Sequence, residues 1–373
     1  MTRRTVAVFT GSRAEYGLLR PVLDALDALN ETDLRLIVGG AHLVGDPPTS
    51  AEIQAERTVH AVVEMQGEQA RTRLADAQAV ARGIRGISES LAIMKPDFLL
   101  ILGDRIEVLA AATAASLLGI RIAHVHGGDV ASGVCDESTR HAVTKMSHLH
   151  FPATPKSGAR IRSMGESPEG VFVVGSPAID GIDQIPPMGD REWDEIGQPR
   201  FVVLHHPVGD SDDVESQRMH QIISGVSRFG RTLLLSPNLD PGSDGIRNAI
   251  RESNLFSLAH LERRDFIGLL KRIDVLVGNS SAGLIECAAL GRPAVDIGDR
   301  QAGRERPDTA IHLDSLTGPG LQGALEQALD LLPGGVDSRF GDGDSGQVIA
   351  HTLATIPLAS VPVRKCWFEP RIP

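Results

Sequence analysis

The sequence predicts a two-domain α/β protein built on parallel sheets. Its 373 residues are more than one domain of roughly 100–200 residues needs. Short apolar runs alternate with longer amphipathic runs, which is typical of strand–helix–strand units with helices on both faces of a parallel sheet. The same alternation starts again near residue 200, after a segment rich in proline and glycine.

The apolar runs define the expected strands, and the amphipathic runs between them define the helices. In the first half the strands are Val6–Phe9, Leu34–Val38, Phe98–Leu102 and Arg121–Val125, and the helices are Glu15–Leu29, Ala70–Met94 and a run from Asp104 to Leu118. In the second half the strands are Phe201–Leu204, Thr232–Ser236 and Val275–Val277. Gly175–Arg191 suits an interdomain linker, and Pro333–Gly346 suits a flexible surface loop.

Composition and charge exclude several classes of function. A net charge of −11 opposes binding to nucleic acid or to an anionic membrane, although a few arginines can still hold a small anion. The three cysteines, Cys135, Cys287 and Cys366, form no CxxC pair, so we expect a reduced cytoplasmic protein without a zinc site. The N-terminus lacks the apolar core of a signal peptide, and no apolar run is long enough to span a membrane.

Polar residues directly after the predicted strands are the candidates for a site, because ligands of open parallel sheets bind beyond the carboxyl ends of the strands. After the first strand, Ser12 is placed to cap a helix, and Arg13 either holds an anion there or is a solvated side chain in an ordinary turn. After the third strand, Asp104 is either a helix cap or a carboxylate that faces the site.

Histidines, glycines and acids crowd the segment after Arg121–Val125. His124 and His126 flank the strand end, Asp129 follows two glycines, and Glu137 and His141 are four residues apart on one helix face. Capping, a surface ion pair and a metal site are alternative explanations. The spacing matches no metal motif such as HExxH, and it suits proton transfer better.

The second half carries a phosphate-binding pattern. His205 and His206 follow a strand directly and either cap a loop or point into a cleft. Gly278–Gly283 either forms a plain turn of small residues or exposes backbone N–H groups to a diphosphate at a helix N-terminus. Glu286, about one turn into the helix that follows, would accept hydrogen bonds from ribose hydroxyls. Gly318–Gly323 formally matches GxGxxG but contains a proline, so we interpret it as a turn before a helix, and NAD binding is not supported.

Taken in order, these motifs resemble the hydrolysing UDP-N-acetylglucosamine 2-epimerases. The matching segments run from residue 5 to about 310 and are Gly11–Leu19, Gly103–Glu107, His126–Asp129, Asp136–Ala142, His206–Pro207, Gly278–Glu286 and Gly298–Arg304. The resemblance implies a glycosyltransferase-B-like fold, in which two Rossmann-like domains face one cleft and the C-terminal segment crosses back to the first domain. On this basis we expect an N-terminal sugar-binding domain over 1–178, a nucleotide-binding domain over 179–355 and a returning tail over 356–373.

The resemblance also implies a reaction. In that family a base removes the C2 proton of the sugar, UDP leaves C1, and water adds to the resulting glycal, without metal or external cofactor. The resemblance to that family also implies that this chain forms a homodimer or homotetramer. The catalytic positions carried over are Asp104, Asp129, Glu137 and His206. The substrate-binding positions are Arg13, His42, Arg105, Asn279, Ser280, Ser281, Gly283, Glu286 and Arg304.

Four departures from the family pattern cluster at these motifs. Asp129 replaces the usual glutamate, Ala282 a serine, Ala302 a lysine and Cys135 a small residue. They leave open an ordinary epimerase with compensating changes, or a relative redirected to elimination and hydration of another nucleotide or nucleoside in secondary metabolism. A catalytically silent binding protein is a third hypothesis, and a glycosyltransferase rests on fold analogy alone.

Overall fold

The computed structural model describes residues 3–44, 48–67, 72–131, 136–238, 240–316, 320–332 and 334–369. The chain forms two compact units. Unit 1 contains the chain up to Asp129, a second stretch that ends at Asp180, and the chain from Gly341 onward. Unit 2 contains Gly181–Phe340 and a short segment that starts at Val130. Each unit is an α/β layer structure, so the predicted two-domain α/β class is confirmed.

Unit 1 is built on a six-stranded parallel sheet. Its strands are β1 (Arg4–Thr10), β2 (Thr32–Gly39), β3 (Val59–Val63), β4 (Phe98–Leu102), β5 (Arg121–Val125) and β6 (Leu149–Phe151), in the order β3-β2-β1-β4-β5-β6. In β1, Val6 lies opposite Leu34 of β2 and Phe98 of β4. This is the strand order of a Rossmann-like fold, whose topological switch point lies between β1 and β4.

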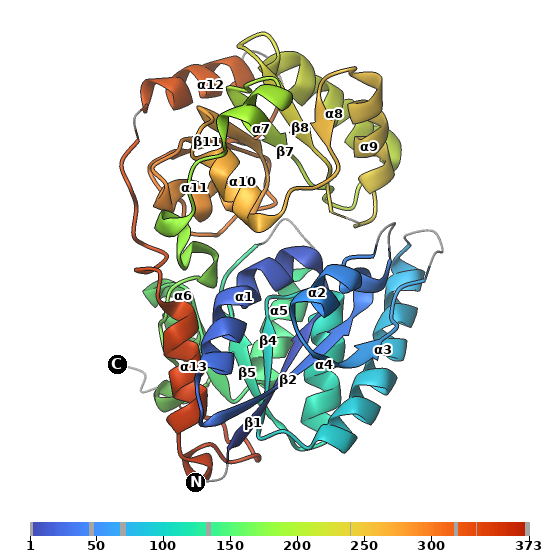
Figure 1. The fold of residues 1–373 in the computed structure, drawn as a ribbon, viewed down its shortest axis with the longest axis vertical. Coiled ribbons are helices and arrows are strands. Elements are labelled where there is room, and N and C mark those ends of the chain that lie inside the picture. The colour runs from blue at the N-terminus through green and yellow to red at the C-terminus, as the bar shows by residue number, and fades with distance from the viewer. Residues whose placement is uncertain are drawn as a thin grey trace. The chain divides into compact units, whose positions relative to one another are not determined.

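Helices cover both faces of this sheet (Figure 1). Because successive side chains of a strand point to opposite faces, Val6 and Val8 pack toward one layer and Ala7 and Phe9 toward the other. The first layer contains α1 (Arg13–Ala28) and α13 (Ser345–Thr355), and the second contains α3 (Arg73–Met94) and α4 (Ile106–Leu117). The other helices of unit 1 are α2 (Ser50–Glu56), α5 (Asp136–Met146), α6 (Pro155–Ser163) and the single turns η1 (Gly40–Leu43), η2 (Pro168–Gly170), η3 (Pro177–Ile179) and η6 (Leu358–Ser360).

The C-terminal segment returns to unit 1 through α13, which packs beside α1 (Figure 1). Gly346 is needed at the contact, since a Cβ there would lie 2.7 Å from the backbone of Pro21. The carboxylate of Asp180 accepts hydrogen bonds from the backbone N–H of Ser345 (3.1 Å) and of Gly346 (2.6 Å). Ser345 and Gly346 therefore begin a helix with one buried face, and the prediction of a flexible loop that extends to Gly346 is wrong at its end.

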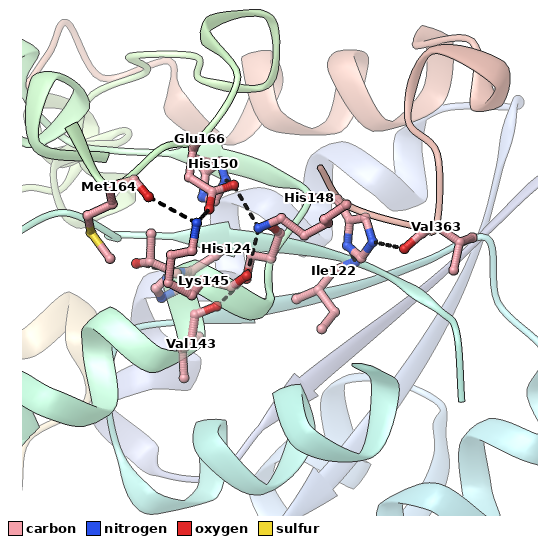
Figure 2. Close-up of polar contacts among 12 residues, drawn as sticks. Ile122, His124, Val143, Lys145, His148, His150, Met164, Glu166 and Val363 are labelled. Carbon is pink, nitrogen blue, oxygen red and sulfur yellow. Dashed lines mark hydrogen bonds and ion pairs between the residues drawn. The ribbon is translucent and has the colours of Figure 1, made fainter. Parts of the chain in front are cut away.

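An ionic cluster fastens the chain beyond α13 to the same unit. Glu166 is 3% exposed; it accepts hydrogen bonds from Lys365 (2.7 Å) and His150 (3.1 Å) and contacts Lys145. Figure 2 shows Lys145 and His150 converging on Glu166, and His148 reaching the carbonyl of Val363. Burial of the Glu166 carboxyl opposes ionisation, but the hydrogen bonds from these three partners outweigh it and lower its pKa to about 2.

Unit 2 repeats the strand order of unit 1. Its strands are β7 (Phe201–Leu204), β8 (Thr232–Leu235), β9 (Ser257–Leu258), β10 (Val275–Gly278), β11 (Ala294–Ile297) and β12 (Ala310–Leu313), all parallel in the order β12-β11-β10-β7-β8-β9. Its switch point lies between β7 and β10. The helices are α7 (Asp190–Glu195), α8 (Asp212–Val226), α9 (Ser243–Glu252), α10 (Arg263–Leu270), α11 (Glu286–Ala289), α12 (Gly320–Asp330) and the turns η4 (Ile182–Gln184) and η5 (Ser281–Gly283). Phe201 and Val203 face a core lined by α8, α9 and α12.

The strands predicted from apolar runs are present within a residue or two of their expected ends. The first helix starts at Arg13, two residues earlier than predicted. The second starts at Arg73, and the first two residues predicted for it lie outside the described ranges. Among the described residues, no helix combines the length and apolar character needed to cross a bilayer.

Candidate functional site

The two switch points collect most of the predicted site residues. In unit 1, the segment after β1 carries Arg13 and the segment after β4 carries Asp104 and Arg105. In unit 2, His206 follows β7 and Asn279 follows β10. Since crevices at such points are the ligand sites of open α/β sheets, each unit presents candidate residues where a ligand is expected.

A buried arginine gathers two carboxylates in unit 1. Arg140 of α5 is 2% exposed; it forms an ion pair with Asp104 and lies 3.7 Å from the Glu137 carboxylate. His141 lies 3.0 Å from the other oxygen of Glu137, which confirms that these two residues share a helix face. The cluster therefore brings Asp104, which follows β4, next to Glu137 in the first turn of α5.

Asp129 is held by a separate set of partners. The Ser157 hydroxyl donates a 2.6 Å hydrogen bond to Asp129, and His126 Nδ1 lies 3.6 Å from the other carboxylate oxygen. His126 in turn contacts the Ser176 hydroxyl at 2.9 Å. Close packing fixes this turn, because a Cβ on Gly128 would lie 2.3 Å from the carbonyl of Ser157. Asp129 is only 7% exposed, and these contacts fix the position of its carboxylate.

His124, the other histidine of this segment, is part of the framework. Its Nε2 donates to the carbonyl of Gly103 at 2.7 Å, and its Nδ1 lies 3.3 Å from the Thr144 hydroxyl. Burial lowers the pKa of His124 to about 3, so the ring is neutral and joins the end of β5 to the segment after β4.

The turn after β1 differs from the prediction in its cap. Ser12 occupies the N-cap position of α1, but its side chain makes no capping hydrogen bond. Glu15 reaches back instead and accepts from the backbone N–H of Gly11 at 3.1 Å. Arg13 lies 3.1 Å from Glu52. Across the switch point, Arg105 lies 3.3 Å from the fully buried Glu107.

His42 lies in η1, after β2. Its Nε2 lies 3.0 Å from the Thr10 hydroxyl and its Nδ1 lies 2.7 Å from the Thr49 hydroxyl. Burial, helped by the charge of Arg13, lowers the pKa of His42 to about 4. A neutral imidazole with both nitrogens in use is suited to position neighbouring groups rather than to carry a proton.

In unit 2, the Asn279 side chain clamps His206 across the switch point. Asn279 accepts a 2.7 Å hydrogen bond from the backbone N–H of His206 and donates to the His206 carbonyl at 2.8 Å. The backbone N–H of Asn238 donates to His206 Nδ1 at 3.1 Å. Because Nδ1 accepts, the proton of the neutral ring is on Nε2. The site therefore offers an oriented imidazole N–H after β7.

The predicted phosphate loop forms a short turn, η5, that precedes the short helix α11. The Ser280 hydroxyl accepts from the backbone N–H of Ala282 at 3.4 Å and caps η5, to which Ser281 and Gly283 belong. Glu286 is the first residue of α11 and is not one turn inside a helix, so its predicted position is wrong by a turn. It is buried and lies 3.5 Å from Arg263.

Gly278 allows this turn to approach the end of β7. Its φ is 145°, and a Cβ there would lie 2.0 Å from the carbonyl of Leu204. Arg304 lies in the loop after β11, where its backbone N–H donates to Gln301 at 3.2 Å. Gln301 of the same loop donates to the Asn279 carbonyl and Asn279 bonds His206, so the loops after β7, β10 and β11 meet at one edge of the unit 2 sheet.

Several groups that hold this arrangement were not predicted. Ser157, Ser176, Glu107 and Asn238 contact predicted site residues, but their sequence positions carry no signal for those contacts. Gly320 begins α12, as expected for a turn before a helix, whereas Gly318, Pro319 and Cys135 lie outside the described residues. Within the described ranges, no three His, Cys, Asp or Glu side chains come together as a metal-ligand set.

Known proteins are similar to this chain in sequence and in fold. The family model described as UDP-N-acetylglucosamine 2-epimerase matches residues 24–354. The UDP-N,N'-diacetylbacillosamine 2-epimerase (hydrolyzing) of Legionella pneumophila is 35% identical over 97% of this chain and 99% of its own. A UDP-N-acetylglucosamine 2-epimerase of Neisseria meningitidis serogroup B is 29% identical over 92% of both.

The fold comparison agrees. The crystal structure of Methanocaldococcus jannaschii UDP-GlcNAc 2-epimerase in complex with UDP-GlcNAc and UDP gives a TM-score of 0.80 at 20% identity, and covers 94% of this chain and 99% of that one. This confirms the glycosyltransferase-B-like fold class. The family match over most of the chain and the 35% identical full-length relative show that this chain belongs to the UDP-N-acetylglucosamine 2-epimerase family.

Proposed function

We propose that this protein is a hydrolysing 2-epimerase of a UDP-linked 2-acetamido sugar. The observation that carries the proposal is the 35% identity, over nearly the full length of both chains, to a relative described as hydrolysing. The geometry supports it with a pair of carboxylates on Arg140 in unit 1 and an oriented imidazole in unit 2. We assign the sugar chemistry to unit 1 and the grip on UDP to unit 2.

The proposed reaction has an elimination step and an addition step. A carboxylate removes the C2 proton, the C1–O bond breaks, and UDP leaves with the bonding electrons. Water then adds its oxygen to C1 of the glycal and a proton is delivered to C2 from the opposite face, which gives the free 2-epimer. Two faces require two proton-carrying groups, and Asp104 and Glu137 are the pair that Arg140 brings together.

The remaining predicted residues take supporting roles in this proposal. His206 presents its Nε2–H to the departing diphosphate, because Asn238 occupies Nδ1. Asp129 is the third carboxylate of the proposed site in unit 1, and the Ser157 hydroxyl fixes its position. Arg13, His42 and Arg105 hold the sugar and phosphates from unit 1. Asn279, Ser280, Ser281, Gly283, Glu286 and Arg304 shape the nucleotide side in unit 2.

Two substrates are candidates within this class. The family description and the Neisseria relative indicate UDP-N-acetylglucosamine. The higher identity to the Legionella relative favours UDP-N,N'-diacetylbacillosamine, a sugar with a second acetamido group. The ratio of kcat/KM values for the two compounds decides between them, because it measures differential transition-state binding directly.

The decisive experiment is incubation with each UDP-sugar in deuterated water, read by mass spectrometry and by UDP release. We expect stoichiometric UDP and a free sugar with one deuterium, at C2. UDP release without deuterium would show simple hydrolysis. Binding without exchange would show a silent protein, and turnover of other nucleotides or nucleosides alone would favour a redirected lyase.

Variants connect the reaction to the proposed groups. Replacing Glu137 by Gln or Asp104 by Asn should lower kcat by roughly 100-fold to 10,000-fold, as expected for loss of an acid–base group. Glu89→Gln is the matched control, since Glu89 is 67% exposed on α3 and pairs with Arg85 on the same helix. Equal activity in Glu137→Gln and the control would contradict the assignment of Glu137.

A further inference from the structure

The fold of unit 2 does not by itself explain why a histidine is buried at position 205. His205 follows β7 directly, at the switch point of unit 2, and is 1% exposed. Within the described part of the chain, neither of its ring nitrogens has a hydrogen-bond partner. The adjacent His206, by contrast, accepts from Asn238 through Nδ1.

A buried imidazole without partners is energetically unfavourable. The neutral ring has one N–H donor and one acceptor, and leaving such groups unpaired costs about 1–3 kcal/mol. Burial, with the positive charges of Arg218 and Arg300, lowers the pKa of His205 to about 3, so the ring is neutral at physiological pH. An apolar side chain of similar size would avoid this cost. The histidine is therefore better explained by a ligand than by the core.

The surroundings of His205 indicate an anion. Arg300, in the loop after β11, donates to the carbonyl of Asn279 at 3.2 Å, and Gln301 donates to the same carbonyl at 2.8 Å. These contacts join the loop after β11 to the turn after β10, and the turn itself lies against the end of β7 at Gly278. Arg218 is paired with Asp210 and Glu215, so Arg300 is the guanidinium group that supports an anion here. A neutral N–H donor within the electrostatic influence of Arg300 suits phosphate oxygens, which accept hydrogen bonds from both kinds of donor.

We propose that His205 is a further nucleotide-binding residue, whose ring N–H donates to a diphosphate oxygen of UDP when the loop that carries Arg300 admits the nucleotide. This inference rests on the proposed function, because it deepens the role of unit 2 as the UDP-binding unit. It adds a ligand contact directly after β7, at the residue next to His206.

The test compares UDP binding with the stability of the unliganded protein. In His205→Phe we expect the dissociation constant for UDP, measured by calorimetry, to rise at least tenfold, which matches loss of one hydrogen bond to a charged group. We expect its unliganded melting temperature to stay the same or rise. His205→Gln, which retains a donor, should recover part of the affinity.

A matched control and separate outcomes keep the inference distinct from the proposed function. His220→Gln, on α8, changes a histidine that is 45% exposed and paired with Glu252, and it should bind UDP like the wild type. Unchanged affinity in His205→Phe, or a melting temperature that falls by several degrees in His205→Phe and is restored in His205→Gln, would overturn this inference alone. A folded wild type that does not bind UDP would contradict both.

Discussion

At the scale of single residues, Asp129 is the departure that the structure describes most fully. Its carboxylate is held by the Ser157 hydroxyl at 2.6 Å, at a position where the resemblance predicts a glutamate. The extra methylene of glutamate would advance the carboxylate by about 1 Å, a distance that can change rates on the order of 100-fold. For an ordinary epimerase, Asp129→Glu should keep or raise activity on UDP-N-acetylglucosamine, measured as kcat/KM.

Two further variants make that prediction specific. Asp129→Asn retains the size but not the charge, and should lower kcat/KM by roughly 100-fold. Ser157→Ala removes the hydroxyl that fixes Asp129 and should have a smaller effect in the same direction. Complete loss of activity in Asp129→Glu would count against the ordinary epimerase and favour a site adapted to aspartate and to another substrate.

Some residue contacts could be predicted from sequence spacing, and others could not. Glu137 and His141 were predicted to share a helix face because residues four apart on a helix are neighbours, and they lie 3.0 Å apart. The hydrogen bond between Ser157 and Asp129 joins α6 to a turn after β5 and depends on packing that local patterns do not encode. Ser12 has the expected cap position, but Glu15 satisfies the backbone N–H there.

At the scale of elements, Asn279 links the ends of two strands. Its side chain makes both hydrogen bonds to the backbone of His206 and is 1% exposed. Asn279→Ala loses both bonds, worth about 1–3 kcal/mol together, and releases His206 from its position. We expect the melting temperature to fall by a few degrees and kcat/KM for the UDP-sugar to fall at least tenfold.

An exposed asparagine provides the comparison for that prediction. Asn248 lies on the surface of α9, so Asn248→Ala should change neither quantity. If Asn279→Ala lowers stability but leaves kcat/KM intact, the clamp serves the fold only, and the assigned role of His206 loses its structural support.

The cluster around Glu166 predicts how acid affects the C-terminal attachment of unit 1. The pKa of Glu166 is about 2, below its ordinary value of 4.5. A depressed carboxyl pKa stabilises the fold at pH values above 4.5, and this stabilisation is lost as the pH falls from 4.5 toward 2. Glu166→Gln should therefore melt roughly 5–10 °C below the wild type at neutral pH, and the gap should narrow below pH 4.5.

Melting curves from pH 7 to pH 3 measure this directly. Glu169→Gln is the control, because Glu169 is a nearby exposed glutamate in η2, and it should follow the wild type at every pH. A gap between Glu166→Gln and wild type that stays constant through acid would show that ionisation of Glu166 does not stabilise the attachment.

At the scale of the whole molecule, the same strand order occurs twice. The apolar runs predicted β1, β2, β4, β5, β7, β8 and β10 because these strands are largely buried and form continuous hydrophobic stretches. The strands β3, β6, β9, β11 and β12 were not predicted; Val59–Val63 is only partly buried, and Ser257–Leu258 has two residues. Strand order itself is not written in local periodicity, and it entered only through the resemblance of ordered motifs to a known family.

The repeated strand order predicts where UDP protects the backbone. If unit 2 grips the nucleotide, hydrogen exchange should slow in the segments after β7, β10 and β11, which cover residues 205–208, 279–284 and 298–304. At 100 times its dissociation constant, UDP stabilises the bound state by about 2.7 kcal/mol, so exchange there can slow up to about 100-fold. Segments β8 and β9 of the same sheet lie beyond the switch point and should change little. Hydrogen exchange measured by mass spectrometry distinguishes these outcomes, with α13 of unit 1 as an internal reference. A groove between α8 and α12 is lined by Gln217, Gln221 and Leu321. Protection confined to that groove would place the nucleotide elsewhere.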